Sequence, residues 1–225
     1  TFCLYFPQTN APAESQFTAP PVAHASGGGQ RILYVDDEEA LVFLTTRVLE
    51  RLGYQVTGRS DAKQALAELH TDPMQFDAVV SDLSMPGMGG LEAARRIITR
   101  YPTARILIFS MLENTAFISQ ALKVGVKGYV SKTGAASEIA NAVLAIAKGN
   151  TYLSADIAHK IAQQSLAGED DPLRQLSARE FEIFRLVAEG LSAEAIADML
   201  KISHKTVSNY HTMIKRKLGV DTPIE

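Results

Sequence analysis

Ala78-Val-Val-Ser-Asp-Leu-Ser-Met-Pro-Gly-Met-Gly-Gly90 carries the clearest signal for the fold of this chain. The apolar run from Ala78 to Val80 is typical of a short strand buried on both faces, and Met85-Pro-Gly87 ends it. Asp82 therefore lies at the carboxyl end of a strand, the edge where open parallel α/β sheets bind ligands. A lone aspartate there is more often a solvated turn residue, so the case for a site depends on its neighbours.

The segments around this strand alternate between short apolar runs and helix-forming stretches. Five strands that alternate with five helices predict an α/β fold with a doubly wound, five-stranded parallel sheet. The other strands are predicted at 32–35, 54–57, 105–109 and 126–130, and the helices at 38–52, 61–69, 91–100, 114–124 and 137–148.

Length and composition favour two domains and exclude several classes of protein. The chain has 225 residues, 46% of them hydrophobic, and a net charge of -3, so its total charge indicates neither nucleic acid nor membrane. The single cysteine, Cys3, excludes an internal disulfide framework and suits a reducing cytoplasm. The apolar run from Ile139 to Ala147 is too short to span a bilayer, so we expect a cytoplasmic protein without a membrane segment.

Polar side chains follow four of the predicted strands. Asp36 and Asp37 follow the first strand, Asp82 follows the third, Ser110 ends the fourth, and Lys132 comes after the fifth. Because the carboxyl ends of parallel strands meet at one edge, these side chains should converge. Each has a plainer explanation alone, as an acidic first helical turn, a satisfied strand end or a solvated loop charge. Their coincidence at successive strand ends favours a functional site.

This set of side chains suits the transfer of a phosphoryl group onto a carboxylate. Three converging carboxylates repel one another, and a hard divalent cation such as Mg²⁺, which keeps waters and takes few protein oxygens, relieves the repulsion. In this interpretation Asp82 attacks, the metal bridges enzyme and phosphoryl oxygens, Lys132 neutralises charge, and Ser110 hydrogen-bonds the product.

Three segments at this edge carry a family resemblance: Leu33-Tyr-Val-Asp-Asp37, Ser81 to Gly90, and Gly128-Tyr-Val-Ser-Lys132. From Arg31 to about Lys148 the chain resembles the flavodoxin-like receiver domain of two-component response regulators. Many receivers have a proline after the lysine, whereas this chain has Thr133, as is usual in the NarL/FixJ subgroup. The resemblance implies the phosphoacceptor Asp82; the Mg²⁺ ligands Asp37, Asp82 and the Ser84 backbone carbonyl, with Asp36 acting through water; and the phosphoryl-binding and switch residues Ser110, Tyr129 and Lys132.

The last fifty residues predict a small all-helical domain. A connecting helix at 157–166 and a polar stretch at 168–172 precede it. Ser177-Ala-Arg-Glu180 is a capping box that opens a helix to Ala188, and Ser192 starts a helix to Leu200. Ser203 caps a final helix to Leu218, and the short turn before it gives helix-turn-helix spacing.

The final helix has one face for packing and one polar face. Between Lys201 and Lys217 the basic residues are not offset by any acid, which provides positive charge for phosphates. A charge run alone is more often a solubilising surface, but this one coincides with helix-turn-helix spacing. A projection at about 100° per residue places four residues on the packing face: Val207, Tyr210, Ile214 and Leu218.

Leu176-Ser-Ala-Arg-Glu180, Ile196-Ala197, Thr206-Val207 and Lys217-Leu-Gly-Val220 resemble the LuxR-type DNA-binding domain. With the receiver, this makes a NarL/FixJ-type response regulator. Its implied partners are a histidine kinase as phosphodonor and double-stranded DNA, and it implies a homodimer when the protein is phosphorylated and full-length. The implied DNA contacts are Ser208, Asn209 and Thr212 at bases, Lys205, Thr206 and Lys215 at phosphates, and Arg216 on the same face.

The predicted divisions are a disordered linker at 1–30, a receiver at 31–149, a linker with a helix at 150–172 and the DNA-binding domain at 173–225. Thr1-Phe-Cys-Leu-Tyr-Phe-Pro7 resembles the last strand of the ATP-binding domain of histidine kinases. The chain is expected to be a fragment. It also stops at Asp221-Thr-Pro-Ile-Glu225, which is typical of a helix start, so the DNA-binding domain is expected to be truncated and to bind DNA weakly.

These features favour a phosphorylation-dependent transcription regulator rather than an enzyme that turns over an external substrate. We further expect the receiver to hide the last helix until it is phosphorylated. One alternative is the phosphoacceptor and output tail of a hybrid histidine kinase. Another is a haloacid-dehalogenase-like phosphatase, but that class needs a second acid two residues after its nucleophile, where this chain has Ser84.

Overall fold

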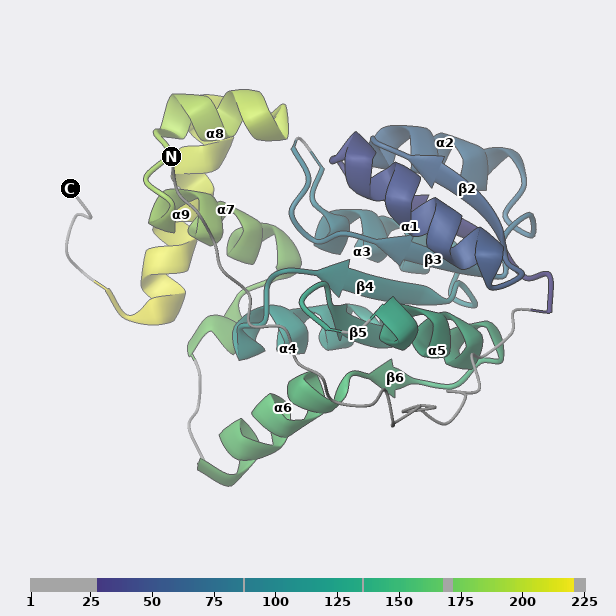
Figure 1. Cartoon of the computed structure of the whole chain (residues 1–225). Coiled ribbons are helices and arrows are strands. Elements are labelled where there is room, and N and C mark those ends of the chain that lie inside the picture. The colour runs from purple at the N-terminus through teal and green to yellow at the C-terminus, as the bar shows by residue number, and fades with distance from the viewer. Residues whose placement is uncertain (1–27, 87, 135, 168–171, 221–225) are drawn as a thin grey trace, which may run out of the picture.

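The computed structural model describes residues 28–86, 88–134, 136–167 and 172–220 (Figure 1). The predicted N-terminal strand, most of the predicted linker before residue 31 and the predicted helix start at 221–225 lie outside these residues. None of the described helices is long and apolar enough to cross a membrane.

The first domain is built on a parallel sheet with the strand order β2-β1-β3-β4-β5-β6. The predicted α/β fold class and the five predicted strands are confirmed, and the sheet has one strand more than predicted. That sixth strand pairs with Gly128 and Tyr129 of its neighbour. It fell within the predicted linker because two residues are too few to show an alternating pattern. The strands are β1 Arg31–Val35, β2 Gln55–Arg59, β3 Ala78–Ser81, β4 Ile106–Ser110, β5 Gly128–Ser131 and β6 Tyr152–Leu153.

Helices cover both faces of this sheet (Figure 1). Alternate residues of each strand point to opposite layers, so Leu33 packs in one apolar cluster and Tyr34 in the other. One cluster includes residues of α2, α3 and α4, and the other includes Leu49 of α1 and Val143 of α5. The helices of this domain are α1 Glu39–Arg51, α2 Ala62–Thr71, α3 Gly90–Arg100, α4 Thr115–Val124, α5 Ala136–Ala147 and α6 Ala155–Ala167.

Helix α6, which the sequence placed in a connecting segment, packs against α4 and β5 of the first domain. Its Ile157 is fully buried. The backbone of Gly128 makes room for β6 before this helix, because a Cβ at Gly128 would lie 2.5 Å from the Tyr152 carbonyl oxygen. The connecting segment therefore adds a strand and a helix to the first domain.

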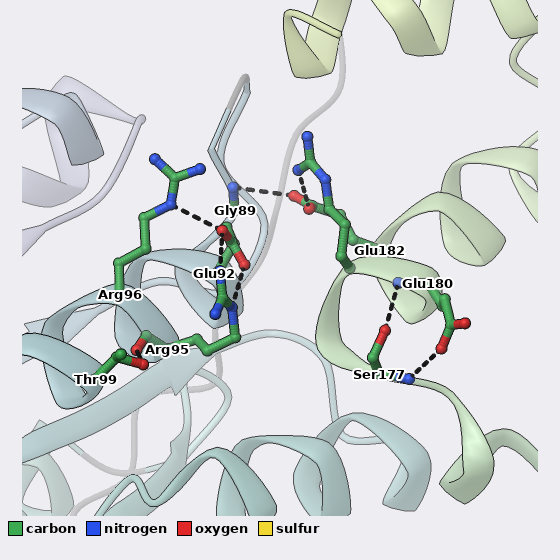
Figure 2. Close-up of polar contacts among 9 residues, drawn as sticks. Gly89, Glu92, Arg95, Arg96, Thr99, Ser177, Glu180 and Glu182 are labelled. Atoms are coloured by element: carbon green, nitrogen blue, oxygen red, sulfur yellow. Dashed lines mark hydrogen bonds and ion pairs between the residues drawn. The ribbon is translucent and has the colours of Figure 1, made fainter. Parts of the chain in front are cut away.

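The second domain is helical, with the capping signals at the predicted positions. The Ser177 side chain accepts from the Glu180 backbone N–H while the Glu180 carboxylate accepts from the Ser177 N–H, which is the predicted capping box (Figure 2). Ser192 and Ser203 cap the next two helices. Lys201 takes the left-handed conformation (φ 52°) in the turn between them. The elements are a 3-10 turn η1 Pro172–Gln175 and helices α7 Ala178–Ala188, α8 Ala193–Leu200 and α9 His204–Leu218.

The two domains pack together through α3 and α4 of the first domain and η1 and α7 of the second (Figure 1). Phe117 of α4 meets Phe181 of α7 edge to face, with ring centroids 4.6 Å apart. The amide of Gln120 donates to the carbonyl oxygens of Leu173 and Leu176 at 2.9 and 2.8 Å. Residues of both domains therefore share one apolar cluster.

Candidate acceptor site and nucleic-acid interface

Two buried aspartates and one lysine meet at the carboxyl ends of β1, β3 and β5. Lys132 Nζ lies 2.6 Å from Asp36 Oδ2 and 3.1 Å from Asp82 Oδ1. Asp36 is 1% exposed and Asp82 is 5% exposed. Buried charges are costly unless paired, so the lysine is needed to hold both carboxylates in this position. The arrangement places the Asp82 carboxylate beside a buried positive charge.

Further hydrogen bonds orient the two carboxylates. The Ser84 N–H donates to Asp82 Oδ2 at 2.8 Å, and the Tyr34 hydroxyl donates to Asp36 Oδ2 at 2.7 Å. Burial raises the pKa of Tyr34, which keeps its hydroxyl protonated as a donor. Tyr34 was not among the predicted site residues, although its position two residues before Asp36 gives both side chains the same direction.

Asp37 supplies a third carboxylate, with its side chain exposed at the rim of the site. Partial desolvation of the carboxyl group raises the pKa of Asp37, and the negative charges of Asp36 and Asp82 raise it further. Lys132 offsets only one of these three negative charges. Among the described residues, no three His, Cys, Asp or Glu side chains lie close enough together to hold a metal ion as they stand. The donors are nonetheless all hard oxygens with excess negative charge, which fits Mg²⁺ in kind and in charge.

Ser110 and Tyr129 both hold the loop that follows β4. The Leu112 N–H donates to Ser110 Oγ at 3.4 Å, and the buried Tyr129 hydroxyl donates to the Leu112 carbonyl oxygen. Burial raises the pKa of Tyr129, and the charge of Asp82 adds to this effect. A new hydrogen bond made by the Ser110 hydroxyl would therefore alter the loop that Tyr129 also holds.

Glu113, in the same loop, contacts three other side chains and was not among the predicted site residues. Its carboxylate accepts hydrogen bonds from Ser131 Oγ, Thr133 Oγ1 and Lys160 Nζ. The Lys160 ammonium, with the two hydroxyls, lowers the pKa of Glu113 to about 2. These contacts connect the loops after β4 and β5 to α6, so the surroundings of the acceptor site are tied to the segment that leads into the second domain.

The loop between Asp82 and α3 contacts the second domain directly. A Cβ at Gly90 would lie 1.8 Å from the Asp82 carbonyl oxygen, so the loop can fold back here only with glycine. The Gly89 N–H donates to Glu182 Oε1 of α7 at 3.1 Å, and Arg179 holds that carboxylate at 2.6 Å. Figure 2 shows Glu182 reaching across the domain boundary to Gly89. The sequence offered no signal for this contact.

Helix α9 has the two faces that the sequence predicted. Val207 and Ile214 are buried, and Tyr210 and Leu218 pack partly buried against the core. On the other face Thr206 and Lys215 are half-buried, and the remaining predicted contacts are exposed: Lys205, Ser208, Asn209, Thr212 and Arg216.

The expectation that the receiver hides this helix is wrong in its direct form. The predicted base contacts Ser208, Asn209 and Thr212 remain exposed while the domains are packed together. Two of their hydroxyls are engaged within the helix, since Ser208 donates to the His204 carbonyl and Thr212 donates to the Ser208 carbonyl. The domain contact uses α7 instead, so any control of DNA binding acts through domain position and not through covered side chains.

Both domains match known family models. Residues 32–144 match the response regulator receiver domain, and residues 174–223 match the bacterial regulatory proteins of the luxR family. The chain is 31% identical over 198 residues to the response regulator GacA of Pseudomonas aeruginosa, covering 87% of this chain and 92% of the relative. It is 30% identical over 198 residues to the response regulator UvrY of Escherichia coli, covering 86% and 90%.

Solved structures of similar proteins match most of this chain. The chain resembles RcsB from Salmonella enterica serovar Typhimurium bound to a promoter in the presence of phosphomimetic BeF3-, with 28% identity, a TM-score of 0.66 and coverage of 86% of this chain and 94% of that chain. A second structure of Salmonella typhimurium RcsB matches with a TM-score of 0.68 and 27% identity over 87% and 94%.

These matches bear on the alternatives. This chain matches 92% and 90% of the length of these two response regulators. That match disfavours the alternative in which the chain is the tail of a hybrid histidine kinase. The phosphatase alternative requires a second carboxylate two residues after Asp82. Ser84 stands at that position and contacts Asp82 through its backbone N–H group.

Proposed function

Because this chain belongs to the two-component response regulators that join a receiver domain to a LuxR-type DNA-binding domain, we propose that Asp82 is its phosphoacceptor and that phosphorylation controls its binding to DNA. The protein is a DNA-binding transcription regulator that takes its phosphoryl group from a histidine kinase. The observation that carries the assignment to Asp82 is its burial at a strand end beside Asp36 and Lys132.

The chemistry follows from these groups. A carboxylate oxygen of Asp82 attacks the phosphorus of the kinase phosphohistidine; a P–O bond forms, the P–N bond breaks and the imidazole leaves. Lys132 offsets the negative charge of the transferred group, and the Ser110 hydroxyl donates to one of its oxygens. Mg²⁺, held by Asp37, Asp82 and the Ser84 carbonyl, with Asp36 acting through water, would neutralise phosphoryl oxygens.

Control of DNA binding follows from the contact between Gly89 and Glu182. A phosphoryl group adds negative charge to Asp82, on the same loop that the Glu182 carboxylate contacts. The loop after β4 is tied to Ser110 and Tyr129 and reaches α6 through Glu113 and Lys160. We therefore expect phosphorylation to shift the population from packed domains toward separated domains, in which α9 can approach a duplex freely.

DNA recognition is assigned to the exposed face of α9. RcsB is seen on promoter DNA with a phosphomimetic, and RcsB dimers are seen on DNA, so we propose that this chain too binds double-stranded DNA as a homodimer when phosphorylated. Ser208, Asn209 and Thr212 are proposed to face the bases. The proposed phosphate contacts are Lys205, Thr206, Lys215 and Arg216. A cytoplasmic location is part of the same proposal.

The acceptor assignment is tested by modification with acetyl phosphate and Mg²⁺, followed on a phosphate-affinity gel. Wild type and Asp77→Asn, which changes a surface aspartate ion-paired with Arg31 at the opposite end of β3, should be modified equally. Asp82→Asn should not be modified. Undiminished modification of Asp82→Asn would show that another residue accepts the group.

The DNA face is tested by selecting binding sites from a pool of random duplexes and then measuring variants on the selected site. Asn209→Ala should relax the preference for sequence, whereas Lys205→Gln should weaken binding to all sequences alike and reduce its dependence on salt. If both variants bind as wild type does, α9 is not the reading helix.

A further inference from the structure

A cavity of about 180 Å³ lies between the two domains, and its described lining does not include Asp36, Asp82 or Lys132. The first domain contributes Lys63 from α2 and Arg96 from α3, and the second contributes Arg179 from α7 and Lys201 from the turn after α8. Four cationic side chains from four elements thus surround one space. Among the described residues that line the cavity, Glu92 is the single carboxylate.

The local carboxylates do not neutralise this lining. Glu92 is already bound by Arg95 and Arg96, each at 2.8 Å, and Figure 2 shows the two arginines on either side of it. Arg179 is paired with Glu182 at 2.6 Å. Among the described residues no acid forms a salt bridge with Lys63 or Lys201. Two positive charges therefore stand unpaired in the cavity.

Lys63 and Lys201 face each other across the domain boundary. The Lys201 ammonium, by direct contact and by its charge, lowers the pKa of Lys63. Each lysine stands on a fixed backbone: Lys63 in the first turn of α2, where its N–H donates to the Asp61 cap at 2.7 Å, and Lys201 at the C-cap of α8. Packing of the domains thus brings two like charges together at a cost that an anion between them would remove.

We propose that this cavity binds a small inorganic phosphate anion, orthophosphate or pyrophosphate, and that the bound anion holds the two domains together. Arginine offers the planar donor groups that match phosphate oxygens, and the lysines add point charges from both sides. The space holds one or two phosphoryl groups and is too small for a duplex, so the DNA backbone is not its ligand. Because half of the cations come from each domain, the site exists only while the domains are packed.

The proposal is tested by titrating the full chain calorimetrically with orthophosphate and with pyrophosphate, in EDTA so that the Mg²⁺-dependent acceptor site is silent. Lys63→Gln and Lys201→Gln should each weaken binding at least tenfold. The matched controls are Lys127→Gln and Lys148→Gln, which change two exposed lysines elsewhere on the first domain; both should bind as wild type does. The anion that binds more tightly shows whether the cavity fits one phosphoryl group or two.

A second variant separates ligand binding from folding. In Lys63→Glu the new carboxylate lies opposite Lys201 and replaces the anion, so the domains should stay packed without phosphate. Small-angle scattering should show that phosphate makes the wild type more compact and leaves Lys63→Glu unchanged. The proposal is overturned if the wild type binds neither anion saturably, if both lysine-to-glutamine variants bind as tightly as the controls, or if phosphate leaves the wild-type dimensions unchanged.

Discussion

Replacing Gly89 with alanine should loosen the packing of the two domains. A Cβ at this position would lie 2.8 Å from Glu182 Oε1 and 3.3 Å from the Leu83 carbonyl oxygen. The backbone itself accepts alanine, since φ is -64°. The carboxylate must therefore move away, and the hydrogen bond from the Gly89 N–H is lost.

The size of the effect follows from that bond. A hydrogen bond to a charged group contributes about 1.5–3 kcal/mol, and about 1.4 kcal/mol corresponds to a factor of ten in an equilibrium constant. The ratio of packed to separated domains should then fall by about ten- to a hundredfold. Glu182→Ala removes the same bond from the other side, so the double variant should cost no more than either single one.

Domain separation is measured by small-angle scattering, and DNA affinity by titration without phosphorylation. Gly89→Ala and Glu182→Ala should both expand the protein and bring its DNA affinity closer to that of the phosphorylated form. Glu50→Ala is the matched control, because this glutamate is exposed and pairs with Arg47 within its own helix, α1. Unchanged dimensions in both variants, or additive effects in the double variant, would refute the reasoning.

Three further perturbations test the acceptor site and its loops. Lys132→Ala leaves the buried Asp36 and Asp82 without a positively charged partner and should lower the free energy of unfolding by about 3–5 kcal/mol in chemical denaturation; an unchanged free energy would contradict this. The pKa of Glu113 is lowered from 4.5 to about 2, so its stabilising contribution is present above pH 4.5 and is lost as the pH falls toward 2; unfolding curves of wild type and Glu113→Gln should converge over that range. If the two curves stay parallel, the Lys160 contact contributes nothing. Gly90→Ala should destabilise the fold more than Gly89→Ala, because its Cβ meets backbone and not the end of a side chain, and equal melting temperatures would contradict this.

The meeting of Asp36, Asp82 and Lys132 could be predicted because all three side chains follow strand ends. Asp82 and Lys132 are located by the apolar runs before them, and a parallel sheet brings those ends to one edge whatever the loops do. The caps of the second domain were equally clear, since Ser177 with Glu180 is a local signal that needs no tertiary information.

The contacts that link the parts could not be predicted in the same way. Lys160 meets Glu113 across 47 positions, and Glu182 meets Gly89 across 93, and neither pair stands out by spacing or periodicity. Strand β6 is two residues long, so its pairing depends on the bare backbone of Gly128 and not on a pattern of its own. The position of one domain against another is set by such non-local contacts, which periodicity does not encode.

The two hydrogen bonds of Gln120 have a consequence for protein engineering. This amide is 3% exposed and satisfies two carbonyl oxygens of the other domain, at Leu173 and Leu176. A chimera that joins this output domain to a foreign receiver domain lacking an equivalent amide would remove this donor from both oxygens. The Leu173 oxygen would still accept from the Leu176 N–H at 3.2 Å, whereas the loss at the Leu176 oxygen would cost about 1–3 kcal/mol. Such hybrids should therefore keep the α4 surface that carries Gln120 together with the output domain.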